Sequence, residues 1–212
     1  MKKTLIFLPI ILIVITVLLN SCMKKVPEYE FKLDPQLVNS SNYFSEFEKW
    51  TIEKKIYKNF KASLFITVTY LSWPYRKAYV KELASKKQMP LNDQARLIED
   101  ELSTVENYME FFIVVYTHES NKSDFNKKES MWSIFLVNSR GERIDPIQID
   151  MISFNTPMEK YFYPNIDRWS KVYKIRFENL LNNEKFFKPT DQNFKLYITG
   201  LEAKAEFLWD LQ

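Results

Sequence analysis

The chain has 212 residues, of which 46% are hydrophobic and 27% charged, a composition that fits one ordinary globular domain. Its 17 Phe, 12 Tyr and 5 Trp residues allow a large core without disulfides, which a chain with a single cysteine cannot form internally. The net charge of only +3 argues against nucleic acid as a partner, because nucleic-acid-binding proteins carry a clustered excess of Lys and Arg.

The first 21 residues predict an export signal rather than part of the fold. Lys2 and Lys3 give a positively charged start, and residues 4–19 form an apolar run interrupted only by Pro9 and Thr16. A membrane-spanning helix needs about 20 apolar residues, so this run is short for one. Small or polar residues at its end complete the pattern of a signal peptide.

The end of this signal, Leu19-Asn20-Ser21-Cys22, resembles the lipobox of bacterial lipoproteins. The resemblance implies that the thiol of Cys22 takes up a diacylglyceryl group, that signal peptidase II cuts between Ser21 and Cys22, and that the new amine is acylated, for example with palmitate. Two or more acyl chains hold a protein stably on a membrane, so we expect the lipid bilayer as a partner. An uncleaved signal anchor is the alternative.

The residue after the cysteine bears on which membrane of the cell envelope carries the protein. In enterobacterial lipoproteins an Asp at this position marks retention in the inner membrane. Here the residue is Met23, so the resemblance favours the outer membrane, facing the periplasm, over the inner membrane. Residues 22–45 then predict a lipidated flexible tether, because Pro27, Pro35 and a run of Asn and Ser offer no core of their own.

The remaining residues, 46–212, predict a single β-rich globular domain. Residues 61–72 alternate as a strand does, and residues 47–60 favour a strand with a helix as the alternative. Ser72 with Pro74 predicts a helix start, and Asn92 predicts the cap of a second helix. We therefore expect a helical insertion at about 73–108, between the second and third strands.

The second predicted helix has the clearest apolar stripe in the chain. Its apolar residues follow steps of 4, 3, 4, 3 and 4, and they are Leu91, Ala95, Ile98, Leu102, Val105 and Met109. Such spacing places them along one face of a helix, which we expect to be packed against the domain.

Strands dominate again beyond residue 110. The runs that predict strands are 111–118, 131–139, 144–154, 168–179, 194–200 and 203–211, with a hairpin turn at 140–143. Short connections favour antiparallel pairing. We therefore predict a mainly β fold, an antiparallel β-sandwich, with an immunoglobulin-like arrangement as one form of it. The alternative is an α+β fold with one curved sheet packed on the helices.

Several chemistries are disfavoured by residue usage. The only glycines, Gly141 and Gly200, cannot supply the glycine-rich loops that bind nucleotides. His118 is the only histidine, and one His with one lipidated Cys cannot build a Cys/His zinc site. We therefore predict no catalytic residue, no metal ligand and no cofactor.

Two functional alternatives remain besides a non-catalytic protein that binds or scaffolds another envelope component. Glu142, Asp145 and Asp150 lie close in sequence, and a pair of carboxylates is what a glycoside-hydrolysing envelope enzyme needs. Tyr161, Tyr163 and Trp169 are candidate binding aromatics, which would suit a glycan- or solute-binding module. The partner is accordingly expected to be an envelope protein or a glycan.

A basic run also marks the start of the predicted domain. It consists of Lys54, Lys55, Lys58 and Lys61. The favoured interpretation is the solvated face of a strand or helix, and contact with anionic lipid is the alternative.

Overall fold

A computed structural model describes residues 42–58, 61–117, 123–154, 156–188, 190–201 and 203–211, with the side chains of residues 58 and 61–63 left out. The predicted signal peptide, with Ser21, and the residues Cys22 and His118 lie outside the described residues. The helices are α3 (Asn42–Trp50), α4 (Trp73–Lys87), α5 (Leu91–Asn107) and α6 (Pro157–Phe162). The strands are β1 (Thr51–Lys58), β2 (Lys61–Tyr70), β3 (Tyr108–Thr117), β4 (Trp132–Asn138), β5 (Arg143–Ile144), β6 (Gln148–Ile152), β7 (Lys171–Glu178), β8 (Leu180–Leu181), β9 (Glu184–Lys185), β10 (Asn193–Gly200) and β11 (Lys204–Asp210).

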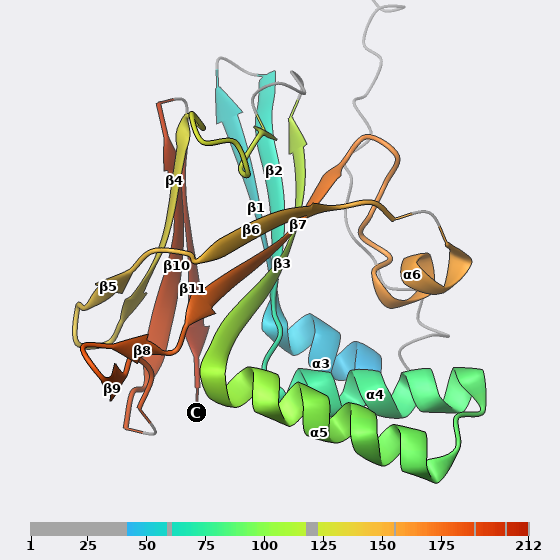
Figure 1. The fold of residues 1–212 in the computed structure, drawn as a ribbon. Helices are drawn as coiled ribbons and strands as arrows, with labels where there is room; N and C mark the ends of the chain where they lie inside the picture. The colour runs from blue at the N-terminus through green and yellow to red at the C-terminus, as the bar shows by residue number, and fades with distance from the viewer. Residues whose placement is uncertain are drawn as a thin grey trace, which may run out of the picture. The chain divides into compact units, whose positions relative to one another are not determined.

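Two antiparallel sheets form the body of the described domain (Figure 1). The larger sheet has the strand order β1-β2-β3-β7-β6, and the smaller has the order β11-β10-β4-β5. Strands β8 and β9 pair with each other in a small third sheet. The prediction of a mainly β, antiparallel sandwich with a helical insertion is confirmed.

Aromatic side chains fill the space between the two sheets. The ring of Tyr70 lies 5.0 Å from that of Phe194, and the ring of Phe111 lies 5.5 Å from that of Trp209, so rings of the larger sheet meet rings of the smaller. These residues lie on one side of strands whose side chains alternate between two faces. Phe111 and Phe194 are completely buried, as the predicted aromatic core requires.

Helix α3 begins earlier than the predicted domain. Residues 42–45, predicted to end the tether, instead form its first turn, and Tyr43 and Phe44 are buried. The Tyr43 hydroxyl donates a hydrogen bond to the Phe162 carbonyl (2.6 Å) and lies 3.1 Å from the Tyr75 hydroxyl. Residues 47–60 are therefore neither one strand nor one helix, because α3 ends at Trp50 and β1 follows directly.

Helices α4 and α5 form the predicted hairpin between β2 and β3. Ser72 caps α4 by accepting a hydrogen bond from the Tyr75 backbone amide (3.3 Å), as predicted. Helix α5 starts at Leu91 behind Pro90, so Asn92 lies inside the helix and is not its cap. Met109, predicted to extend the helical stripe, is a buried residue of β3. Within the described ranges, no helix is both long and apolar enough to cross a membrane.

The segment 144–154 does not form one strand. Residues 143–144 pair with β4 in the smaller sheet, and residues 148–152 pair with β7 in the larger one. Pro146 lies in the crossing between the sheets, where its missing backbone N–H costs no ladder hydrogen bond. Strand β7 likewise begins at Lys171, so Trp169 precedes the strand to which the sequence assigned it.

Candidate functional site

Helix α5 is unusual because none of its 17 residues is buried. Leu91 is 80% exposed and Leu102 is 39% exposed. A surface helix of a globular protein normally buries its apolar stripe against the core, which supplies most of its stability. The rest of the described domain therefore covers only part of the apolar face of α5.

The sides of α5 differ in how much solvent they meet. The half-buried residues are Gln94, Leu97, Ile98, Glu101, Thr104 and Val105. On a helix wheel of 100° per residue these residues share one side, which we infer to be the side turned toward the domain. Leu91, Ala95 and Leu102 lie next to that side and are exposed. We call Leu91, Ala95, Ile98, Leu102 and Val105 the α5 stripe: its inner edge is half-buried and its outer edge faces solvent.

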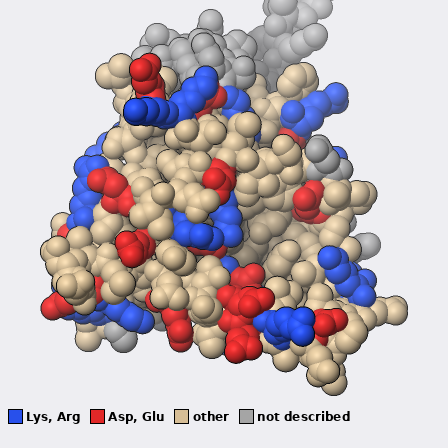
Figure 2. All heavy atoms as spheres, viewed as in Figure 1, with Lys and Arg blue, Asp and Glu red and all other residues tan. Residues whose placement is uncertain are grey.

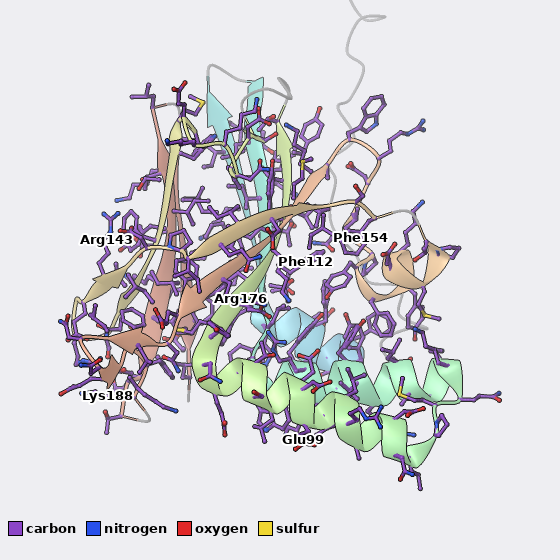
Figure 3. The ribbon with its side chains drawn as sticks, in the orientation of Figure 1. Glu99, Phe112, Arg143, Phe154, Arg176 and Lys188 are labelled. Carbon is purple, nitrogen blue, oxygen red and sulfur yellow. The ribbon has the colours of Figure 1, made fainter. Side chains whose placement is uncertain are left out.

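Acidic residues border the outer edge of the α5 stripe. Glu99 lies one helical turn beyond Ala95, Glu106 lies one turn beyond Leu102, and both glutamates are exposed. Figure 3 shows Glu99 on the side of α5 that faces away from the sheets, and Figure 2 shows Asp and Glu side chains gathered over this part of the molecule. The exposed outer edge of the α5 stripe is thus apolar, and negative charge borders it on the side away from the domain.

A buried ion cluster lies where α4 and α5 meet the larger sheet. Its centre is Glu110 of β3, which is completely buried. One Glu110 oxygen accepts a hydrogen bond from Arg76 Nη2 (2.5 Å) and lies 3.0 Å from Lys174 Nζ; the other accepts from Arg176 Nε (2.8 Å). Figure 3 places Arg176 between the strands and the helical hairpin.

Three cations around one carboxylate decide its protonation state. Burial by itself would raise the pKa of Glu110, but hydrogen bonds and charges from Arg76 and Lys174 outweigh burial and hold the pKa below its usual value. Both oxygens already accept hydrogen bonds from charged side chains. The carboxylate is therefore suited to holding these elements together rather than to exchanging protons.

Arg76 connects this cluster to α5. Its Nε donates to the Leu71 carbonyl (2.8 Å), its Nη2 binds Glu110, and its Nη1 forms an ion pair with Glu101 of α5. At the end of the helix, the Asn179 backbone amide donates to the Asn107 carbonyl (2.9 Å). These contacts position α5 against the sheet while the outer edge of its stripe stays exposed.

The structure separates the three predicted binding aromatics. The ring of Tyr163 stacks on that of Phe112 at 3.9 Å, and the Tyr161 hydroxyl donates to Glu82 (2.5 Å) beneath the Lys86 ammonium. Trp169 is 71% exposed in the turn before β7. The two tyrosines therefore pack between elements, and Trp169 alone of the three offers an open ring.

The three predicted carboxylates each bind a different local partner. Glu142 accepts hydrogen bonds from Asn138 (2.7 Å) and Arg140 (2.7 Å) at the turn between β4 and β5. Asp145 accepts from Arg143 (2.6 Å), and Asp150 of β6 accepts from Gln148 (2.7 Å) in the larger sheet. Among the described residues, no group of three His, Cys, Asp or Glu side chains is placed to hold a metal ion.

The sequence contained a signal for the ion cluster that the predictions did not use. Glu110 is a lone carboxylate within the apolar run of β3, and Lys174 and Arg176 share the outer face of β7. A carboxylate inside a buried strand needs a positively charged partner, and Lys174 and Arg176 are two cations on the same face of another strand.

Comparison with models of known protein families, with curated proteins and with solved structures found no match.

Proposed function

We propose that this chain is a lipid-anchored, non-catalytic protein of the bacterial cell envelope that binds a partner protein through the α5 stripe. The lipobox-like sequence around Cys22 supports the anchor, and residues 22–41 supply the tether. The observation that carries the binding role is the exposure of Leu91 and Leu102 on a helix held in place by the Glu110 cluster. An apolar strip that a rigid domain presents to solvent marks an interaction surface.

The charge of α5 points to the kind of partner. Within the helix, Arg96 is the one basic residue against five acidic residues, which are Asp93, Glu99, Asp100, Glu101 and Glu106. Apolar residues at 4-3 spacing are the positions that face a partner helix, and the residues beside them select it by charge. Two copies of α5 would bring like charges together. The best-matched occupant is therefore an amphipathic helix with Lys or Arg along its borders.

The anchor is tested by replacing Cys22 with serine in cells that express the full chain. Because only a thiol accepts the diacylglyceryl group, Cys22→Ser should abolish labelling by a clickable fatty acid and leave the protein at its unprocessed, larger size. Met23→Ser is the matched control and should remain labelled and processed. Labelling that persists in Cys22→Ser would contradict the proposed anchor.

The α5 stripe is tested with a synthetic amphipathic helix that has leucines at 4-3 spacing and lysines beside them. The full-length protein should bind this peptide, and Leu102→Asp should weaken binding at least about tenfold, because a charge would be buried against leucines (about 1.4 kcal/mol per factor of ten). Fluorescence anisotropy measures the affinity. Ser103→Asp makes the same charge change at the neighbouring exposed position and should alter the affinity little.

Two results would count against this partner. Equal binding of a peptide with glutamates in place of the lysines would remove the role of the acidic border. Concentration-dependent dimers in analytical ultracentrifugation that Leu102→Asp abolishes would make a second copy of α5 the occupant instead.

A further inference from the structure

Three exposed large apolar residues lie at the end of the sandwich opposite helices α3, α4 and α5. Tyr57 near the end of β1 is 61% exposed, Trp169 in the turn before β7 is 71% exposed, and Leu201 between β10 and β11 is 92% exposed. Lys58 pairs with Lys61 and Lys171 with Val115 at one end of the larger sheet, and Gly200 pairs with Trp132 at one end of the smaller sheet. In Figure 1 these are the upper ends of the two sheets.

Basic residues surround these apolar tips. We define the basic end as the described segments 55–57, 124–130, 167–171, 199–201 and 203–204. They contain six Lys and Arg residues against three Asp and Glu residues. In Figure 2, several Lys and Arg side chains lie along the upper edge of the molecule, with Asp and Glu side chains between them. The α5 helix at the opposite end is acidic, so the two ends of the domain differ in charge.

Ion pairs and hydrogen bonds engage charged residues of both signs at the basic end. Asp124 forms ion pairs with Lys127 and Lys171, and Lys55 forms one with Glu53. Asp167 accepts hydrogen bonds from the backbone amides of Trp169 (2.7 Å) and Ser170 (2.8 Å), which fixes the turn that exposes the indole ring. Arg168 lies over that ring, with its guanidinium carbon 5.5 Å from the ring centroid. The turn thus presents an aromatic ring and a cation together.

We propose that the basic end is a lipid-facing surface that rests on anionic phospholipid while the acidic α5 end points away from the bilayer. Trp and Tyr favour the interface between headgroups and acyl chains, and Lys and Arg are attracted to anionic headgroups. Exposed apolar tips within a basic surface match both preferences. A soluble protein partner would also match the positive charge. It would not explain why Trp169 and Leu201 are exposed at the tips of separate turns.

The tether length is compatible with this orientation. Nineteen residues separate Cys22 from Asn42, and at about 3.4 Å per residue they span at most about 65 Å. A ten-residue strand such as β2 is about 33 Å long. A chain lipidated at Cys22 therefore has enough reach for the end remote from α3 to touch the membrane. This inference rests on the proposed lipid anchor and extends it, because it assigns the anchored domain an orientation.

The test uses the full chain, purified after expression in bacteria and reconstituted into vesicles. Leu201→Cys is labelled with the environment-sensitive dye NBD, which leaves Trp169 in place, and Ser103→Cys on α5 is the matched control. In vesicles of phosphatidylcholine mixed with phosphatidylglycerol, the emission at position 201 should shift to shorter wavelength, and that at position 103 should not. In phosphatidylcholine alone, and at high salt, the shift at 201 should shrink because the attraction is screened.

Charge variants separate lipid attraction from simple proximity. Lys128→Glu with Lys204→Glu should remove most of the shift at 201 in anionic vesicles, whereas Lys81→Glu with Lys87→Glu on α4 makes an equal charge change at the other end and should leave it intact. An unshifted NBD emission at 201 in anionic vesicles would overturn the orientation. Failure of the anchor is distinguishable: the chain without an added cysteine would then take up the dye at a free Cys22 thiol.

Discussion

Glu110→Ala is expected to lower the free energy of unfolding by about 3–5 kcal/mol. The substitution would leave Arg76, itself buried, without its partner on β3, and would remove the group that binds Lys174 and Arg176. Removing one partner of a buried ion pair is costly because the remaining charge stays out of water. Urea denaturation of the purified protein, followed by tryptophan fluorescence, measures the change.

A matched control distinguishes the buried cluster from a general effect of losing a carboxylate. Glu106→Ala removes an exposed carboxylate from α5 and should change the free energy of unfolding by no more than about 0.5 kcal/mol. A loss for Glu110→Ala as small as that of Glu106→Ala would contradict the role of the cluster. Loss of peptide binding in Glu110→Ala at temperatures where the protein is still folded would show that the cluster also positions α5.

The Glu110 carboxylate also makes the free energy of unfolding depend on pH, and the direction of its pKa shift gives the sign. Because the folded pKa of Glu110 lies below its value in the unfolded chain, folding favours the ionised form. Its contribution is complete above the unfolded pKa of about 4.3 and is lost as the pH falls through the lowered folded pKa. The unfolding free energy of the wild type should therefore fall more steeply below about pH 4 than that of Glu110→Gln.

Local patterns were sufficient for most of the fold because they report on single elements. The alternation of residues 61–70 and 194–200 identified β2 and β10, and Ser72 with Pro74 identified the start of α4. What these patterns do not contain is pairing between distant segments. The crossing at Pro146, which sends β5 and β6 to different sheets, depends on which strand each one meets.

The candidate site was only half predictable for the same reason. The 4-3 spacing from Leu91 to Val105 correctly indicated an amphipathic helix, but spacing does not say what lies opposite the apolar face. Amphipathic helices usually cover a core, so the stripe was expected to be packed. Its exposure depends on how α5 lies against α4 and the larger sheet, which involves contacts between distant segments such as Arg76–Glu101 and Arg76–Glu110.

Phe44→Ala is the second substitution with a large expected effect, a loss of about 3–5 kcal/mol in the free energy of unfolding. Phe44 is completely buried, and its ring packs edge-to-face on Tyr43 (5.1 Å) and Tyr161 (5.4 Å), so its removal leaves a cavity between α3 and α6. The sequence placed this residue in the tether because an Asn- and Ser-rich run precedes it. Thermal and urea denaturation measure the loss.

Ser45→Ala is the control that shows whether the loss in Phe44→Ala comes from the Phe44 side chain or from any substitution in this turn of α3. Ser45 is the next residue of the same helical turn and is exposed, so its substitution should change the free energy of unfolding by no more than about 0.5 kcal/mol. Equal and small losses for both variants would return the start of the folded unit to residue 46. A large loss for Phe44→Ala alone would show that α3 belongs to the folded unit, in which the Tyr43 hydroxyl contacts that of Tyr75.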